Sequence, residues 1–392
     1  MNPGTRVATA LVAVVVLNLP LGTVYAFSVF IRPFETELAL SRAQLSFVFG
    51  LALVCFTAGM NLAPLFYRAA RPWVLVAGAA SVAALGMALA AMASTILPLT
   101  LGYGVFFGFG GGAAYALVLQ GVNLMLRSHR GLVNGFIVSL FPAGAMIGAP
   151  IFGLALGQWG LRATLGGLAA TLAIAGALSA LLVAACTMPL APPAEGAAAP
   201  LPQRRASIFW RLWAIFFLAA AAGLTVLGQA AGMVEAYGGT PALALSATTA
   251  ITAFITAARI GGGWLADRFS AAMVMAGAHL LALGGNLLLF AFPAPLVAVA
   301  TLAMVGSGYG LVSGSTAAAI GVYWGPNHYG RLAGRLYVAW CVAAITLPVL
   351  AGRLFDITGG YALAILIAGI GNLLGFAIAA SLPRRAPATG GG

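Results

Sequence analysis

"PLAPPAEGAAAPLPQRR", residues 189–205, decides the fold of this chain because it separates two long sets of apolar runs. It is rich in proline and alanine and ends in polar residues, a composition typical of a linker. Six apolar runs precede it and six follow it. We therefore predict a six-helix bundle over 1–188, a linker over 189–207, and a second six-helix bundle over 208–392.

The composition indicates a polytopic membrane protein. Of 392 residues, 62% are apolar and 6% are charged, and the mean hydropathy is +1.06, which no soluble domain matches. A helix needs about 20 apolar residues to cross the hydrocarbon core of a bilayer. We predict an all-α fold with twelve transmembrane helices near 7–31, 43–66, 72–94, 97–125, 131–157, 163–187, 209–233, 242–266, 271–291, 294–323, 331–355 and 360–382.

The arginines set the expected orientation. All 18 basic residues are arginines, scattered singly between apolar runs, which favours membrane topology over nucleic-acid binding. With both termini in the cytoplasm, thirteen arginines lie inside, four lie outside, and Arg259 lies within the membrane. The short loops favour a bacterial inner membrane, and we expect a monomer. In the first external loop, we expect Glu35 and Glu37 to be solvated beside Arg32 and Arg42.

Arg259 is the strongest functional signal in the chain. It lies in the apolar stretch 243–265, and no acidic residue falls within one helical turn of it. A charge at membrane depth costs at least ~2.5–3.5 kcal/mol, so it usually faces a water-filled cavity or a ligand. A guanidinium suits a carboxylate because it donates two parallel hydrogen bonds. The alternative is that Arg259 snorkels toward the nearby cytoplasmic surface.

Twelve helices in two halves with a cytoplasmic linker resemble the major facilitator superfamily, whose substrate site lies between the halves near the membrane midplane. "GGGWLADRF", residues 261–269, is similar to the superfamily's G-x-x-x-D-R loop. This resemblance implies that Gly263 permits close helix approach and that Asp267 and Arg268 act as gating residues.

The first-half counterpart of that loop is "APLFYRAARP", residues 63–72. It has Tyr67 where the superfamily has an aspartate, and it retains Arg68 and Arg71. The resemblance therefore implies an asymmetric inner gate to which Arg68 contributes.

A narrower resemblance covers nearly the whole chain. "LGTVYAFSVF", residues 21–30, is similar to the opening of the oxalate–formate exchangers and their monocarboxylate-transporter relatives. The glycine-rich run around Tyr115 and the segments "GSGYGLVSGS" (306–315) and "GRLYVAW" (334–340) follow in that family's order. In that family, an arginine four residues before a glycine pairs with the substrate carboxylate, and Arg259 occupies this position.

Arg259 and several hydroxyl-bearing or aromatic side chains form the expected site for a small organic anion. A tyrosine carries a hydroxyl donor on an apolar body, which fits such a pocket. For each aromatic residue, helix packing is the alternative role. The expected substrate-binding residues are Arg259, Tyr25, Tyr115, Tyr309, Tyr337, Ser313, Phe27 and Trp340.

Two departures from the family narrow the expected substrate. The exchangers carry a second cation where this chain has Trp340, which argues against dicarboxylates. The animal transporters carry an aspartate where this chain has Ile255, and a lysine that has no counterpart near Ser28, so their proton-coupling residues are missing.

We expect a secondary active transporter of monocarboxylates resembling lactate. It would work by alternating access, with proton symport or anion exchange, and it would need no cofactor and no metal. The three cysteines lie in apolar runs and suggest neither disulfides nor a metal site. The alternatives are a dicarboxylate or formate exchanger and an efflux pump for apolar compounds. No catalytic cluster indicates an enzyme.

Overall fold

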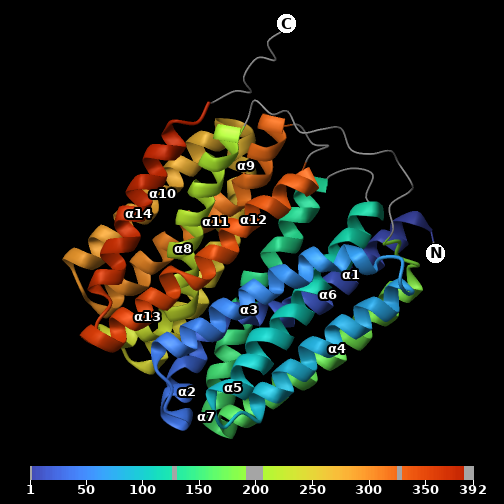
Figure 1. Ribbon diagram of the computed structural model, residues 1–392, viewed down its shortest axis with the longest axis horizontal. Helices are drawn as coiled ribbons and strands as arrows, with labels where there is room; N and C mark the ends of the chain where they lie inside the picture. Colours follow the sequence, from blue (N-terminus) through green and yellow to red (C-terminus); the bar gives the residue numbers. More distant parts are fainter. Residues whose placement is uncertain (1, 126–129, 191–205, 325–328, 384–392) are drawn as a thin grey trace, which may run out of the picture. The chain divides into compact units, whose positions relative to one another are not determined.

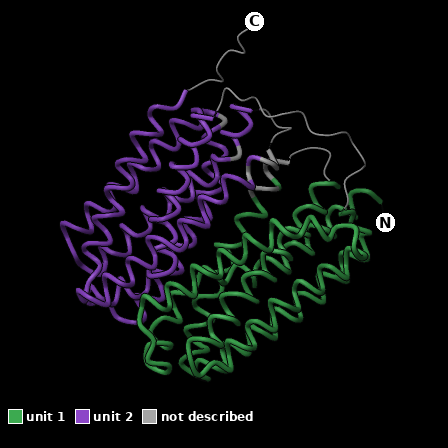
Figure 2. The backbone as a smooth tube through the Cα atoms, viewed as in Figure 1, with its two compact units in different colours: residues 1–195 green, residues 196–392 purple. Residues whose placement is uncertain are grey.

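The computed structural model describes residues 2–125, 130–190, 206–324 and 329–383. These ranges contain helices and turns but no strand. The chain divides into two compact units, unit 1 over residues 1–195 and unit 2 over residues 196–392 (Figure 2).

Unit 1 is built from helices (Figure 1), several of which continue directly into a segment of 3₁₀ or π winding. Pro20 lies inside the first of them, two residues before its end, and leaves one hydrogen bond unmade there because proline has no N–H to donate. The elements of unit 1 are α1 (Pro3–Gly22), the 3₁₀ helix η1 (Thr23–Phe30), α2 (Ile31–Leu38), α3 (Arg42–Leu62), the 3₁₀ helix η2 (Ala63–Phe66), α4 (Pro72–Ala91), α5 (Ile96–Leu99), the π-helix η3 (Thr100–Phe107), α6 (Gly108–Met125) and α7 (Arg130–Ala185).

Unit 2 has seven helices in the described residues. The most extensive contact between two of its helices is that of α9 with α11, and α8 packs on both of them. The elements are α8 (Ala206–Ala236), α9 (Pro241–Phe269), α10 (Ala271–Ala291), α11 (Pro295–Trp324), α12 (Tyr329–Ile345), α13 (Leu347–Thr358) and α14 (Ala362–Ala380).

Eleven helical stretches in the described residues are long and apolar enough to cross a membrane. One of them lies in α7, whose 56 residues would measure about 84 Å as a single helix, far more than a hydrocarbon core of about 30 Å. Gly160 breaks α7 with a φ of +75° and a ψ of 179°, so this element is two helices. The predicted runs 131–157 and 163–187 fall on either side of that break. The all-α membrane fold is confirmed.

The first and last helices of each unit are joined in the same way. In unit 1, Arg6 of α1 donates from Nε to the carbonyl oxygen of Cys186 (3.0 Å) and from Nη2 to that of Thr187 (3.1 Å). In unit 2, Arg211 of α8 donates from Nη1 to the carbonyl oxygen of Ser381 (3.1 Å). An arginine suits this place because the last carbonyls of a helix lack intrahelical donors.

Candidate functional site

Arg259 lies on α9, and its side chain is buried, with 6% of the residue surface exposed. The candidate membrane span of this helix, Pro241–Ala266, ends seven residues later, about 10 Å along the axis. Its Nη2 donates to the hydroxyl oxygen of Tyr309 on α11 at 3.0 Å. The guanidinium carbon also lies 5.3 Å from the centroid of the Tyr309 ring, within the range of a cation–π contact.

Trp340 of α12 completes this group. Its indole Nε1 donates to the same Tyr309 hydroxyl oxygen at 2.7 Å. Tyr309 and Trp340 are 2% and 5% exposed. The structure therefore brings together three of the predicted residues, Arg259, Tyr309 and Trp340, which we call the Arg259 cluster.

Tyr337 packs on the edge of this cluster. Its ring lies edge-on to Trp340, with centroids 6.4 Å apart, and edge-on to Phe216 of α8 at 5.5 Å. Ser313 lies one helical turn after Tyr309 on α11 and is partly exposed. Both residues are thus positioned next to the Arg259 cluster along their helices.

Glycines allow α8, α9 and α11 to approach one another closely around the bond between Arg259 and Tyr309. A Cβ at Gly314 of α11 would overlap the carbonyl oxygen of Arg259, and one at Gly310 would lie 2.8 Å from the carbonyl oxygen of Ile255. On α8, a Cβ at Gly223 would overlap the Tyr309 ring. The glycine pattern of α11 therefore serves to set α11 against α9 at the level of Arg259.

The charge of the Arg259 cluster is positive. A guanidinium keeps its proton in proteins, and the Tyr309 hydroxyl and the Trp340 indole that hydrogen-bond within the cluster are neutral groups. Burial among apolar helices strengthens electrostatic interactions because the local dielectric is low. The cluster is therefore suited to bind an anionic group that accepts hydrogen bonds.

In unit 1, two predicted tyrosines contact one phenylalanine. Tyr25 of η1 and Tyr115 of α6 both lie edge-on to Phe141 of α7, with centroids 6.3 and 5.3 Å away. Phe56 of α3 packs on both Phe141 (5.3 Å) and Tyr115 (5.7 Å). Four helical elements thus meet in an aromatic group that holds both tyrosine rings.

Phe27 belongs to η1 like Tyr25, but its side chain packs in a different aromatic group. It is fully buried and stacks on Phe49 at 5.5 Å, and it contacts Tyr103 of η3 at 5.1 Å and Phe34 at 6.3 Å. The structure does not bring Phe27 into the group around Phe141.

The predicted gating residues lie at the end of α9 and in the turn after η2. A Cβ at Gly263 would make an ordinary contact at 3.6 Å with Gly314, whereas one at Gly262 would lie 2.5 Å from the carbonyl oxygen of Leu311. The tightest approach in this loop therefore falls on Gly262.

Arg268 is exposed, and its guanidinium carbon lies 4.1 Å from the centroid of the Trp264 ring one turn earlier. Arg68 is exposed as well. The side chain of Asp267 lies outside the described residues. Burial raises the pKa of Tyr67 to about 12, so this residue is neutral at physiological pH.

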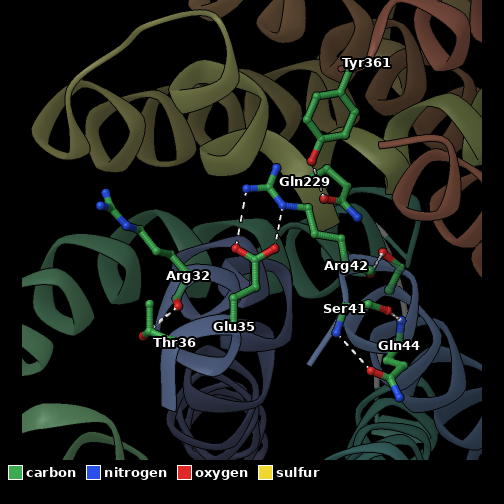
Figure 3. A network of polar contacts seen from close by, with 9 residues as sticks. Arg32, Glu35, Thr36, Ser41, Arg42, Gln44, Gln229 and Tyr361 are labelled. Carbon is green, nitrogen blue, oxygen red and sulfur yellow. Dashed lines mark hydrogen bonds and ion pairs between the residues drawn. The ribbon is translucent and has the colours of Figure 1, made fainter. Parts of the chain in front are cut away.

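Of the two glutamates expected to be solvated in the first external loop, Glu37 is exposed, whereas Glu35 is only partly exposed and pairs with Arg42. Arg42, the first residue of α3, is buried, and its Nε donates to Oε1 of Glu35 at 2.6 Å (Figure 3). Ser41 and Gln44 cap the same helix with reciprocal side-chain to backbone bonds. The Arg42–Glu35 ion pair holds α2 against the start of α3. Counting charges along the sequence does not reveal such a pair.

Unit 2 also has a buried polar contact whose tyrosine the sequence analysis missed. Tyr361, just before α14, donates from its hydroxyl to Oε1 of Gln229 on α8 at 2.8 Å (Figure 3). Phe141, Phe56 and Gly223 were missed too. In an apolar run, a single phenylalanine or glycine follows no sequence pattern that would distinguish a residue of the site from one that only packs between helices.

The comparison with known protein families begins with a negative result, because no family model matches the sequence. Similar proteins include the MFS-type transporter YhjX of Escherichia coli (strain K12), which is 24% identical over 351 residues, covering 86% of this chain and 85% of that protein. They also include human Monocarboxylate transporter 11, which is 31% identical over 352 residues, covering 82% of this chain and 70% of that protein.

Solved structures share the fold at low sequence identity. A D-xylose-proton symporter superposes with a TM-score of 0.78 at 14% identity, covering 97% of this chain and 98% of that one. A bacterial homolog of the human lysosomal transporter Spinster, inward-facing and unoccupied, gives a TM-score of 0.70 at 13% identity, covering 96% of each chain. With these relatives and this fold, the chain belongs to the major facilitator superfamily and is a transporter and not an enzyme.

Proposed function

We propose that this protein is a secondary active transporter of small monocarboxylate anions and that Arg259 binds the carboxylate group. The observation that carries the proposal is the buried guanidinium of Arg259, held by the neutral hydroxyl of Tyr309. The name of the human relative, a monocarboxylate transporter, supports the same substrate class.

The charge of the Arg259 cluster supports a monovalent anion over the other candidates. The cluster contributes one cation and two neutral groups, so one carboxylate neutralises it. A dicarboxylate would bring a second negative charge that this cluster does not match. An apolar or cationic compound offers the Arg259 guanidinium no negatively charged acceptor, which disfavours an efflux role.

We propose that Tyr309, Ser313, Tyr25 and Tyr115 supply further hydrogen bonds during an alternating-access cycle. Trp340 holds the Tyr309 hydroxyl through its indole N–H, and Tyr337 packs against Trp340. Phe27 is left out because it stacks on other aromatic rings of unit 1. The gating roles of Gly263, Asp267, Arg268 and Arg68 stay proposals from the resemblance of their loops to the superfamily pattern.

The environment and the coupling mode are proposals too. The distribution of arginines supports cytoplasmic termini in a bacterial inner membrane, and we propose a monomer. Either proton symport or anion exchange would drive transport. The structural likeness to a proton symporter is a likeness of fold alone.

The test is uptake of radiolabelled lactate into proteoliposomes. We compare wild type with Arg259→Gln, which removes the charge, and with Arg353→Gln, which removes an exposed arginine of the same unit. Losing two charge-assisted hydrogen bonds of about 1.5–3 kcal/mol each predicts a fall in kcat/KM of at least about 100-fold for Arg259→Gln. Arg353→Gln should keep wild-type uptake.

Equal uptake by wild type and Arg259→Gln would overturn the proposed site. The same vesicles distinguish the coupling modes. Uptake driven by an imposed pH gradient indicates proton symport, and uptake that requires lactate loaded inside indicates exchange.

A further inference from the structure

The hydroxyl of Tyr309 has an unusual hydrogen-bond environment. Arg259 and Trp340 both donate to its oxygen, at 3.0 and 2.7 Å. A guanidinium and an indole N–H are donors only, and a tyrosine oxygen has two lone pairs and one hydrogen. These two bonds occupy both lone pairs, so this oxygen meets any further group only as a donor.

The position of the Tyr309 ring is restricted by three neighbouring helices. A Cβ at Gly223 on α8 would overlap the ring, so the ring lies directly against the α8 backbone. Arg259 approaches from α9, and Trp340 approaches from α12. Trp340 is itself supported by the edge of Tyr337. The indole N–H therefore acts on a ring that has little freedom to reorient.

We infer that Trp340 is a positioning residue that makes the Tyr309 hydroxyl a hydrogen-bond donor to the transported anion, so that the site distinguishes a carboxylate from its uncharged amide. The inference rests on the proposed function of the Arg259 cluster. A carboxylate accepts hydrogen bonds at both oxygens, which satisfies the donors of Arg259 and Tyr309 together. The NH₂ group of an amide donates, so it would face a donor at one of the two positions.

The physical reason for selectivity is the penalty for opposing two donors in a buried site. A site built to hydrogen-bond one group rejects an analogue that leaves its buried polar groups unsatisfied. Without the indole N–H, one lone pair of Tyr309 becomes available to accept a bond from an amide. Trp340→Phe therefore lowers the preference for lactate over lactamide while it leaves Arg259 in place.

The experiment measures lactate uptake and its inhibition by lactamide in proteoliposomes. The variants are Trp340→Phe, Tyr309→Phe and the double variant, with Trp324→Phe as a control at another buried tryptophan of unit 2. For Trp340→Phe we expect the KM for lactate to rise about tenfold with kcat changed little, as the loss of one hydrogen bond predicts. The ratio of the lactamide inhibition constant to the lactate KM should fall by about tenfold or more.

The double variant distinguishes positioning from packing. If Trp340 acts through the Tyr309 hydroxyl, Trp340→Phe adds no further loss once Tyr309 is Phe, because the group it positions is gone. Additive losses, or a Trp340→Phe selectivity ratio equal to that of Trp324→Phe, would overturn the inference. Should Trp340→Phe fail to fold, Tyr309→Phe alone must show the same fall in the ratio, and an unchanged ratio overturns it.

Failure of this inference is distinct from failure of the proposed function. Absence of lactate uptake by wild type, or uptake that survives in Arg259→Gln, would overturn the function and the ligand class together. Lactate uptake that depends on Arg259 but shows additive variants would overturn the role of Trp340 alone.

Discussion

Replacing Arg6 by alanine should loosen the end of α7, and Cys186 should report this change. Arg6 donates one bond to the Cys186 carbonyl (3.0 Å) and two to Thr187, at its carbonyl (3.1 Å) and at its Oγ1 (2.6 Å). Cys186 is fully buried. The Arg6→Ala variant removes all three bonds, two of which go to carbonyl oxygens at the end of the helix, so this end should open more often.

The size of the effect follows from where these bonds lie. The bond to Cys186 is partly buried, and a hydrogen bond to a charged group is worth about 1.5–3 kcal/mol. The two bonds to Thr187 are exposed, so water replaces them at little loss. A net loss of about 1.5 kcal/mol makes local opening about tenfold more frequent.

Alkylation of Cys186 measures this opening. Burial is the largest influence on the Cys186 thiol and raises its pKa, although the Arg6 charge acts in the opposite direction, so the closed state reacts slowly. In a background lacking Cys55 and Cys341, a membrane-permeant maleimide should label Cys186 about tenfold faster in Arg6→Ala. Arg211→Ala is the matched control because it removes the corresponding contact in unit 2.

Two results would refute this reasoning. Equal labelling rates in wild type and Arg6→Ala would mean that the three bonds contribute nothing to closure. Equal acceleration by Arg211→Ala would mean that Cys186 reports the stability of the whole protein and not the local contact of Arg6.

Two further predictions concern glycines at helix contacts, with Gly277→Ala as the control because an added Cβ there meets no atom within 4 Å. Gly314→Ala should lower the Tm and raise the KM for lactate, since its Cβ would overlap the Arg259 carbonyl oxygen and overpacking costs about 1–3 kcal/mol. Gly375→Ala should lower the Tm without this change in KM, because its Cβ would overlap the buried His279 ring on α10. Thermal denaturation in detergent and lactate uptake check both, and a Tm at or above that of Gly277→Ala would contradict the contact argument.

The helices were predictable from the sequence because membrane crossing requires long apolar runs, and these runs are visible without tertiary information. The break within α7 is an example. The polar and glycine residues between 157 and 163 predicted two helices, and the structure places the break at Gly160. The changes of winding at η1 and η3 were not predictable in this way, since they alter the hydrogen-bond pattern without altering the hydropathy.

The candidate site was predictable as a set of residues but not as a set of contacts. Arg259, Tyr309 and Trp340 each stood out by chemistry or by resemblance. Their bonds join residues that are 50 and 31 positions apart, and such pairs depend on how α9, α11 and α12 pack. Arg42 shows the converse, because a charge in a predicted loop turned out to be buried against Glu35.

The neutral hydroxyl of Tyr309 suits reversible anion binding at Arg259 better than a carboxylate side chain in its place would. Burying the guanidinium costs at least ~2.5–3.5 kcal/mol at membrane depth. Its bond to Tyr309 and the contact with that ring offset this penalty by amounts of similar size, about 1.5–3 and 0.5–2 kcal/mol. The contacts with Tyr309 therefore offset the cost of burying the guanidinium when no substrate is bound.

A guanidinium has five N–H donors, so a substrate carboxylate binds donors of Arg259 other than the one that Tyr309 accepts. Bonds between two charged groups are roughly twice as strong as neutral ones. An acidic residue in place of Tyr309 would neutralise Arg259 permanently and would remove that advantage. Tyr309 therefore stabilises the buried cation without neutralising it, so the charge of Arg259 still attracts an anion, as the proposed transport cycle requires.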